Sequence, residues 1–483
     1  MMKKIACILY LMAGLLFVTS CEDDYREPTV IVNNYIKEYR DILTSEGCCW
    51  RFDYYPDATQ YGAFNFLMEF SEDGRVKMQT DKNFFYLFAS DEDAEKAYEP
   101  QWSDYTIQNS QGPVLTFATY SLLSKLADPS FVDHNFGSGW TGDNEFVLMG
   151  VSGEKDTIYL KSVRAQKQCF LVKETLGMDA YIDGLNQVVD EFVGSNVPNS
   201  YFRDMEFAGQ EEASAVLVGF DMVTRSGVVY QSVNDSMVTD TCVVCFTPEG
   251  IHLLKPLVVN GVEVNKFVYD GDRGEFLING EIGSVIKMAE NGRPKFRFST
   301  RRQVFRGQYP YVSGRDTIMR EDNYQLAYNP KSAEDEWAKL YNQLENYVMM
   351  AMWANDTIGS SYTFALYDQY QNKSGRTVPV IAQCNMNIRW MSDSEDEDMV
   401  MFAGAGVSSL LYASQNEQYV YEQGTELAKT FESKVAAPLK DYLEALFGNN
   451  RNRIRCVVVP APDYESFSFV NVVDGSELVI FKY

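Results

Sequence analysis

Residues that commonly carry enzymatic chemistry are sparse in this sequence. Only two histidines are present, His134 and His252, so any Ser-His-Asp or Cys-His arrangement would need one of them. His252 lies in an alternating apolar run, which is typical of a half-exposed strand residue. The sequence contains neither the H-E-x-x-H motif of metalloproteases nor a P-loop. These observations indicate no catalytic residues.

Two short motifs have a spacing that is associated with chemistry. Ser152 and Lys155 match S-x-x-K, but Gly153 and the flanking strand-like runs favour a hairpin turn, whereas the β-lactamase-like arrangement needs a helix. Cys242 and Cys245 match C-x-x-C within an apolar, strand-like run, where positions three apart point to opposite faces. Packing in the core is therefore the favoured explanation for both cysteines.

Acidic runs offer oxygen ligands for a cation. Asp393 to Asp398 and Asp270 to Glu275 could bind calcium, but the first run lacks the alternating spacing and the glycine of a calcium loop. A solvated loop and a plain turn are favoured instead. We therefore expect no metal site and no cofactor.

One glycine-rich stretch, His134 to Asp143, is a candidate binding loop. Its glycines expose the backbone, and Trp140 with Asn135 and Asp143 could stack on and hydrogen-bond a sugar or a peptide. The alternative is a loop in which Trp140 packs on its own sheet. We name Asn135, Trp140 and Asp143 as the candidate binding residues.

The elements that would position these residues are mostly strands. Alternating apolar residues predict strands at Trp50–Tyr54, Phe64–Phe70 and many later segments, and Asp73-Gly74 predicts a hairpin turn. Helical spacing predicts five helices, at Pro28–Glu46, Tyr120–Ala127, Asp179–Val193, Ser332–Ala354 and Thr425–Phe447. Similar hairpins at residues 70–76 and 246–251 hint at a duplicated β-unit. The expected fold class is β-rich α+β, with tandem antiparallel β-domains that are barrel- or sandwich-like, connecting helices and a C-terminal α+β region.

The first twenty residues form a targeting segment. Lys3 and Lys4 precede an apolar run of about 14 residues from Ile5 to Val18, which suits a signal peptide and is shorter than the roughly 20 residues of a membrane-spanning helix. Cys21 follows small residues, as in bacterial lipoproteins whose cysteine is acylated and becomes the new N-terminus. Acidic residues 22–24 resemble the surface-export signal of Bacteroidota lipoproteins. We expect a lipid anchor at Cys21 on the outer membrane.

Length and charge divide the rest of the chain and limit its partners. We expect the following segments: 1–20, signal peptide; 21–47, tether and short helix; 48–175, N-terminal antiparallel β-domain; 176–330, second β-domain; 331–483, C-terminal α+β domain. The net charge of −26 argues against nucleic acid, because no basic excess is available to neutralise phosphates. Seven cysteines remain after Cys7 and Cys21, and this odd number does not suggest a disulfide framework.

Several segments together resemble a known lipoprotein family. They are Trp50 with Tyr54-Tyr55-Pro56, Tyr61 to Phe66, Gly112 to Phe117 with Tyr120, Asp128-Pro129, Asp143 to Phe146 and Thr247 to Ile251. In this order they resemble the Bacteroidota family known as domain of unknown function 4302. Members tend to be encoded near SusC- and SusD-like nutrient-uptake proteins, so the resemblance implies a surface role in capture or import. It implies no catalytic residues.

The leading hypothesis is a non-catalytic lipoprotein of the outer-membrane surface. It would bind a ligand, such as a glycan or a peptide, or a partner beside a SusC/SusD-like uptake complex. One alternative is a secreted hydrolase that acts on a glycan or peptide through paired carboxylates, which the fold rather than the sequence would bring together. The other alternative is a structural or assembly subunit.

Overall fold

The computed structural model describes residues 28–82, 84, 100–118, 120–128, 139–194, 201–210, 213–234 and 236–298. Beyond residue 298 it describes mainly strand segments. The signal peptide, Cys21, the acidic run 22–24 and the loop residues His134 and Asn135 lie outside the described residues. The chain divides into two compact units, residues 1–186 and 187–483, and the division falls within helix α6 (Met178–Val193).

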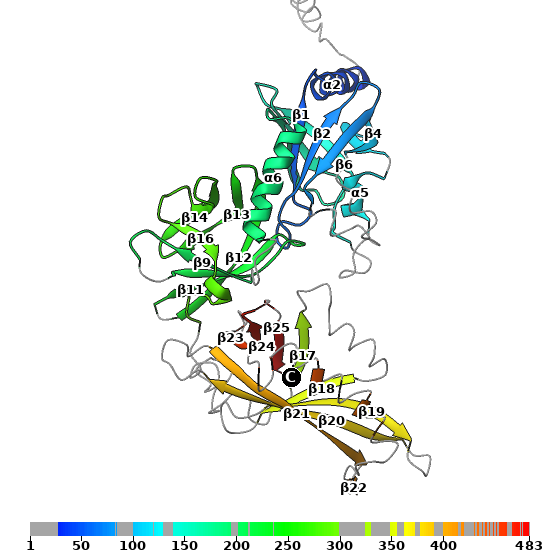
Figure 1. Cartoon of the computed structure of the whole chain (residues 1–483). Coiled ribbons are helices and arrows are strands. Elements are labelled where there is room, and N and C mark those ends of the chain that lie inside the picture. The colour runs from blue at the N-terminus through cyan, green and yellow to red at the C-terminus, as the bar shows by residue number, and fades with distance from the viewer. Residues whose placement is uncertain are drawn as a thin grey trace, which may run out of the picture. The chain divides into compact units, whose positions relative to one another are not determined.

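The first unit is an eight-stranded antiparallel barrel in which each strand pairs with the next and the last pairs with the first (Figure 1). The strands are β1 (Cys49–Tyr54), β2 (Phe64–Phe70), β3 (Arg75–Thr80), β4 (Gln101–Asn109), β5 (Pro113–Phe117), β6 (Glu145–Val151), β7 (Thr157–Ser162) and β8 (Gln168–Glu174). Their alternating apolar residues point inward, since side chains of a strand alternate between its two faces. All eight coincide with segments that the sequence predicts as strands.

Aromatic side chains fill this barrel. Phe52 stacks on Tyr54 with ring centroids 5.1 Å apart, and Phe146 meets the Phe52 ring edge-on at 5.4 Å. Helix α2 (Pro28–Leu43) precedes β1, and the residues at its C-terminal end, Ile42 and Leu43, are buried. An eight-stranded barrel is just wide enough for side chains to fill it. The interior is thus a packed core.

The second unit begins with another eight-stranded antiparallel barrel. Its strands are β9 (Phe202–Glu206), β10 (Ala215–Asp221), β11 (Ser226–Val233), β12 (Ser236–Thr247), β13 (Gly250–Val259), β14 (Val262–Asp270), β15 (Glu275–Ile278) and β16 (Val285–Met288). β16 pairs with β9 and closes the barrel. Phe192, near the end of α6, lies among Phe220, Phe246 and Phe276, with ring centroids 5.1 to 6.0 Å away.

The third sheet belongs to the same unit. It contains β17 (Tyr324–Asn329), β18 (Val348–Ala354), β19 (Tyr362–Gln371), β20 (Thr377–Trp390), β21 (Met399–Ala413), β22 (Glu417–Tyr419), β23 (Arg455–Pro460), β24 (Ser466–Asn471) and β25 (Glu477–Lys482). β20 pairs with β21 and β17 pairs with β25, so eight of these strands form a closed cycle of pairings to which β22 is attached. Its pairing order therefore repeats that of the two barrels.

The sequence-based fold class is confirmed in its main features, and the tandem domains are barrels rather than sandwiches. Helices at Pro28 and near Asp179 are confirmed, and Leu122–Ala127 forms α5 behind the N-cap Ser121. The similar hairpins do not correspond, because residues 70–76 join the second and third strands of one barrel, whereas residues 246–251 join the fourth and fifth strands of the other. What the two barrels share is the order in which their strands pair.

Some predicted elements are wrong. The helix expected at Ser332–Ala354 is a strand, β18, over its last seven residues, where a continuous apolar run cannot distinguish the two structures by periodicity. The apolar residues of Val258–Val264 predict one strand, but the Asn260-Gly261 turn interrupts it, and the positive φ angles of this turn join β13 to β14. Val378–Cys384 and Met386–Met391, which the sequence predicts as two strands, belong to one strand, β20, up to Trp390. The helix expected at Thr425–Phe447 lies almost wholly outside the described residues.

Within the described part of the chain, no helix combines the length and the apolar character needed to cross a bilayer.

Candidate binding surfaces on the first barrel

The predicted binding loop contributes core residues to the first barrel. Trp140 is buried, and its ring meets Tyr61 at 4.6 Å and Phe64 at 5.6 Å between centroids, both edge-on. Asp143 is buried as well, and Asn135 lies outside the described residues. This packing matches the alternative in which Trp140 packs on its own sheet. A binding role for the three residues stays a prediction.

Asp143 organises one end of the barrel through its backbone and its carboxylate. Its N–H donates to the Tyr54 hydroxyl at 2.8 Å, and its Oδ2 accepts from the Arg164 N–H at 2.5 Å. A Cβ at Gly142 would lie 2.7 Å from the Leu126 backbone, so the chain needs glycine there. Burial raises the pKa of the Tyr54 hydroxyl, which therefore stays protonated. The contacts of Asp143 thus join β1 to the β7–β8 turn.

The other motifs occupy structural positions. His252 is exposed on β13, and Ser152 to Lys155 form the β6–β7 turn. Cys242 and Cys245 are buried thiols of β12. Burial raises the pKa of Cys49, Cys169 and Cys242 to about 12, so these cysteines remain thiols at neutral pH and are poor nucleophiles. Within the described residues no three His, Cys, Asp or Glu side chains are placed to hold a metal ion.

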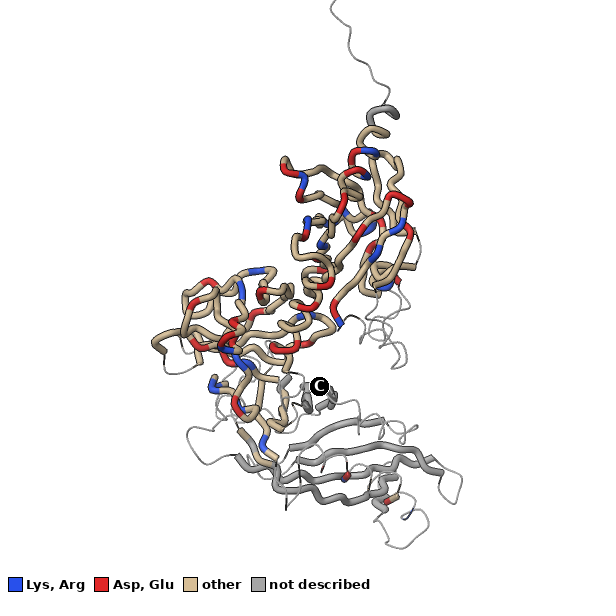
Figure 2. The backbone as a smooth tube through the Cα atoms, turned by 45° about the horizontal axis from the view of Figure 1, so that its top comes forward, with Lys and Arg blue, Asp and Glu red and all other residues tan. Residues whose placement is uncertain are grey.

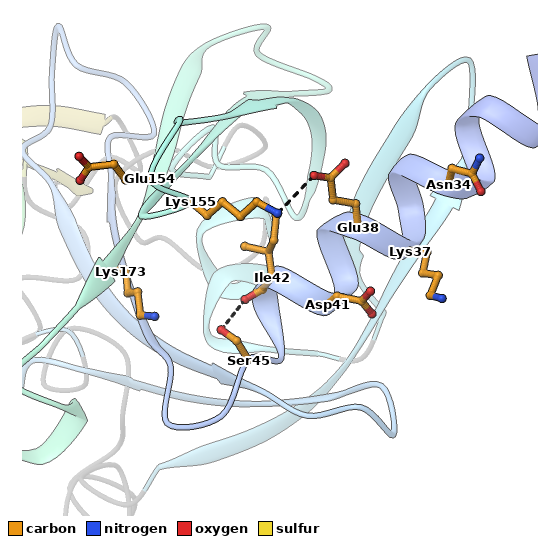
Figure 3. Close-up of a pocket in the computed structure, with 9 residues that line it drawn as sticks. All are labelled: Asn34, Lys37, Glu38, Asp41, Ile42, Ser45, Glu154, Lys155 and Lys173. Atoms are coloured by element: carbon orange, nitrogen blue, oxygen red, sulfur yellow. Dashed lines mark hydrogen bonds and ion pairs between the residues drawn. The ribbon is translucent and has the colours of Figure 1, made fainter.

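A polar groove of about 490 Å³ lies between α2 and the β6–β7 turn (Figure 3). Asn34, Lys37, Glu38, Asp41 and Ile42 of α2 line it, together with Ser45, Glu154, Lys155 and Lys173. The Lys155 Nζ lies 3.6 Å from the Glu38 Oε1, and both side chains are more than half exposed. Such a pair contributes little to stability, because water and salt screen it. Three lysines face three carboxylates, so the groove favours neither sign of charge.

A second surface carries an exposed tryptophan that the sequence analysis missed. Trp102 lies on the outer face of β4 with 57% of its surface exposed, and the Arg75 guanidinium lies over its ring, 5.1 Å from the centroid. Asp73 holds that guanidinium, with Arg75 Nε 2.8 Å and Nη2 2.7 Å from its Oδ2. The alternation of buried Ser103, Tyr105 and Ile107 was a usable signal, because it places Trp102 on the opposite face.

Charged side chains of the neighbouring strands lie in the same row as this indole and in the next row. Trp102 pairs with Lys77 of β3, and Lys77 pairs with Glu69 of β2, so the three form a row across the strands. The Lys77 Nζ lies 3.5 Å from Glu69 Oε2. Arg75 and Asp104 form the next row. Acidic and basic residues are interspersed in this way along both barrels (Figure 2).

The second barrel buries charged groups on two adjacent residues of β9. Burial lowers the pKa of Arg203 to about 10, and its guanidinium donates to the carbonyl oxygen of Phe192, with Nη2 at 2.9 Å. Asp204 accepts from the N–H groups of Lys295 and Phe296, at 2.9 and 3.3 Å. Burial raises the pKa of Asp204 to about 6 despite these hydrogen bonds. These contacts fix the end of α6 and the segment that follows β16.

Comparison with known proteins gives one family. The model of the family described as "Domain of unknown function (DUF4302)" matches residues 25–271, just over half of the 483-residue chain. No curated protein matches. A crystal structure of P47 of Clostridium botulinum E1 has 10% sequence identity over 94% of this chain and 96% of that chain. Its TM-score is 0.13, so this likeness carries no argument.

Proposed function

Since the chain belongs to the DUF4302 family, we propose that it is a non-catalytic lipoprotein of a bacterial outer-membrane surface that binds a ligand or partner beside a SusC/SusD-like uptake complex. The observation that carries this proposal is the N-terminal segment. Its basic start, short apolar run, Cys21 and acidic residues 22–24 have the order of a surface lipoprotein.

The position of α2 supports a tethered protein. Six residues lie between Cys21 and Pro28, the first residue of α2, so seven steps along the chain join them, and an extended chain covers at most about 3.6 Å per step. A lipid on Cys21 would therefore hold the start of α2 within about 25 Å of the membrane surface. Each buried CH₂ contributes about 0.8 kcal/mol, so two or three acyl chains would anchor the protein firmly.

The barrels support binding at outer surfaces. Aromatic side chains fill the first barrel, and Phe192 of α6 lies among three phenylalanines of the second. Ligand contacts then belong to exposed features, such as the groove beside α2 and the face around Trp102. Both lie on the barrel that follows the tether.

The proposal is tested by C21S expressed in place of the native protein. We expect the native protein in the outer-membrane fraction, digested by protease added to intact cells and cross-linked to a SusC/SusD-like transporter. The C21S variant should lose all three properties. C48S is the matched control, because Cys48 is buried beside β1. Membrane recovery of C21S equal to that of C48S, or a native protein that resists external protease and cross-links to no transporter, would contradict the proposal.

A further inference from the structure

We propose that the outer face of β2, β3 and β4 binds a neutral saccharide, with a sugar ring stacked on the side of the Trp102 indole that faces away from Arg75. This inference rests on the proposed function, because it names the ligand class of a surface binding protein. It uses a different part of the barrel from the loop that contains Trp140.

The indole is exposed and its orientation is defined. Trp102 is the only exposed large apolar side chain among the described residues of these three strands. The cation of Arg75 covers one side of its ring at 5.1 Å, which leaves exposed indole for a second contact. The π-face of an indole is electron-rich, and it attracts the positively polarised C–H groups on one side of a sugar ring as it attracts cations.

The hairpin turn between β2 and β3 holds the cation in place. Asp73 binds Arg75 through two guanidinium contacts and accepts from the Ser71 hydroxyl at 2.6 Å. The Ser71 hydroxyl also lies 2.7 Å from the carbonyl oxygen of Arg75, and Gly74 supplies the positive φ of the turn. Hydrogen bonds to Ser71 and Arg75 lower the pKa of Asp73, so its carboxylate stays charged at neutral pH. The aromatic contact is thus organised before any ligand binds.

The charged side chains beside Trp102 can form hydrogen bonds with the hydroxyl groups of a sugar. A sugar hydroxyl can donate to a carboxylate and accept from an ammonium group, and Glu69 with Lys77 offers both in the row that ends at Trp102. Neighbouring strands lie about 4.8 Å apart, so Glu69 is roughly 10 Å from Trp102 along the row, a span suited to two linked sugar rings. The positive and negative groups nearly balance, and the chain carries a net charge of −26. A neutral saccharide therefore fits better than an anionic one.

Another exposed surface of the same barrel is more apolar than the face around Trp102 and has the composition of a protein-binding surface. Tyr159 of β7 and Phe170 of β8 are paired across the strands, exposed and edge-on to each other at 5.8 Å, with exposed Met149 on β6. That surface groups three apolar side chains, as protein interfaces commonly do. The Trp102 face has one ring within a polar array, which suits a polar ligand with one apolar side.

The test uses the full mature lipoprotein in detergent micelles. It is first screened on an array of neutral gluco-, manno-, galacto- and xylo-oligosaccharides, and the best saccharide is then titrated by calorimetry. We expect W102A to weaken binding about tenfold or more, W102F to retain most of the affinity, and R75Q to weaken it by a smaller factor. Y159A is the matched control, because it removes an exposed aromatic ring from the other surface.

Three outcomes would overturn the inference. They are no binding of the native protein to any neutral saccharide, equal affinities of W102A and the native protein, and equal losses in W102A and Y159A. Circular dichroism and hydrogen exchange of β2 to β4 establish that W102A is folded. Failure here leaves the lipid anchor and the surface location intact, since those are measured separately with C21S.

Discussion

The indole N–H of Trp50 donates a hydrogen bond to the carbonyl oxygen of Leu43, 3.1 Å away. Both residues are completely buried. The bond joins the last residue of α2 to the first barrel strand and satisfies a carbonyl group that the helix itself leaves without a partner. It therefore fixes the helix that follows the proposed tether to the barrel.

Replacing Trp50 by phenylalanine should loosen this junction. W50F removes the donor, leaves a buried carbonyl without its partner and opens a small cavity, so we expect a loss of about 2–4 kcal/mol. Hydrogen exchange followed by mass spectrometry should show reduced protection in α2 and β1. The matched control is W102F, which changes an exposed indole. Equal protection in W50F and W102F would show that the Trp50 bond contributes nothing.

Removing the Tyr54 hydroxyl should destabilise the connection between β1 and the β7–β8 turn. Y54F leaves the buried Asp143 N–H without its acceptor, and such a loss costs about 1–3 kcal/mol. D143A keeps the backbone N–H that donates to Tyr54, but it leaves the Arg164 N–H without its acceptor, so we expect it to destabilise the barrel as well. Urea unfolding followed by the fluorescence of the first barrel measures both variants. A midpoint unchanged in both would mean that Asp143 has no structural role.

The stability of the second barrel should depend on pH through Asp204. Its pKa is about 6 in the folded protein and 3.8 ordinarily, so between these values the folded state binds more protons than the unfolded state. The Asp204 contribution to the free energy of unfolding therefore falls as pH rises from about 4 to 6, by about 2–3 kcal/mol, and stays low above 6. Urea unfolding of native protein and D204N at pH 4.5 and 7 measures the difference. If the free energies of unfolding of the native protein and D204N differ by the same amount at both pH values, the raised pKa of Asp204 is contradicted.

Gly250 should tolerate no side chain. It has a φ of +144°, and a Cβ there would overlap the backbone of β14 at the Phe267 carbonyl. We expect G250A to destabilise the second barrel by about 2–4 kcal/mol, because the strand must move to admit the methyl group. Gly153 lies in an open turn, so G153A should change stability by less than about 0.5 kcal/mol. Thermal unfolding compares G250A with G153A. Equal melting temperatures would show that a side chain at position 250 does not clash with β14.

Short apolar runs, some of them alternating, made the first barrel predictable from the sequence. In β3 and β7 buried residues alternate with more exposed ones, and all eight strands of this barrel were predicted, whereas three strands of the second barrel were missed. β9 has buried Arg203 and Asp204 where apolar residues were expected, and β16 has only four residues. Its Asn-Gly pairs are clearer signals, since such pairs favour positive φ in turns, and Asn260, Asn279 and Asn291 all have positive φ.

The candidate sites were harder to predict because exposure depends on the fold. Trp140 and Trp102 both lie near glycine-rich or polar segments, yet the first is buried against Tyr61 and the second is exposed beside Arg75. Glycines near Trp140 suggested an open loop, but Gly142 instead allows close packing on Leu126. The groove beside α2 combines residues more than 100 positions apart, which no local pattern reveals.

If lipid on Cys21 holds this protein at a bacterial surface, the mature protein begins at Cys21, and the mass of its N-terminal peptide reveals the lipid. We expect a peptide that begins at Cys21 and carries the added mass of two or three acyl chains. A peptide that begins elsewhere, or that begins at Cys21 with an unmodified thiol, would contradict the lipid anchor.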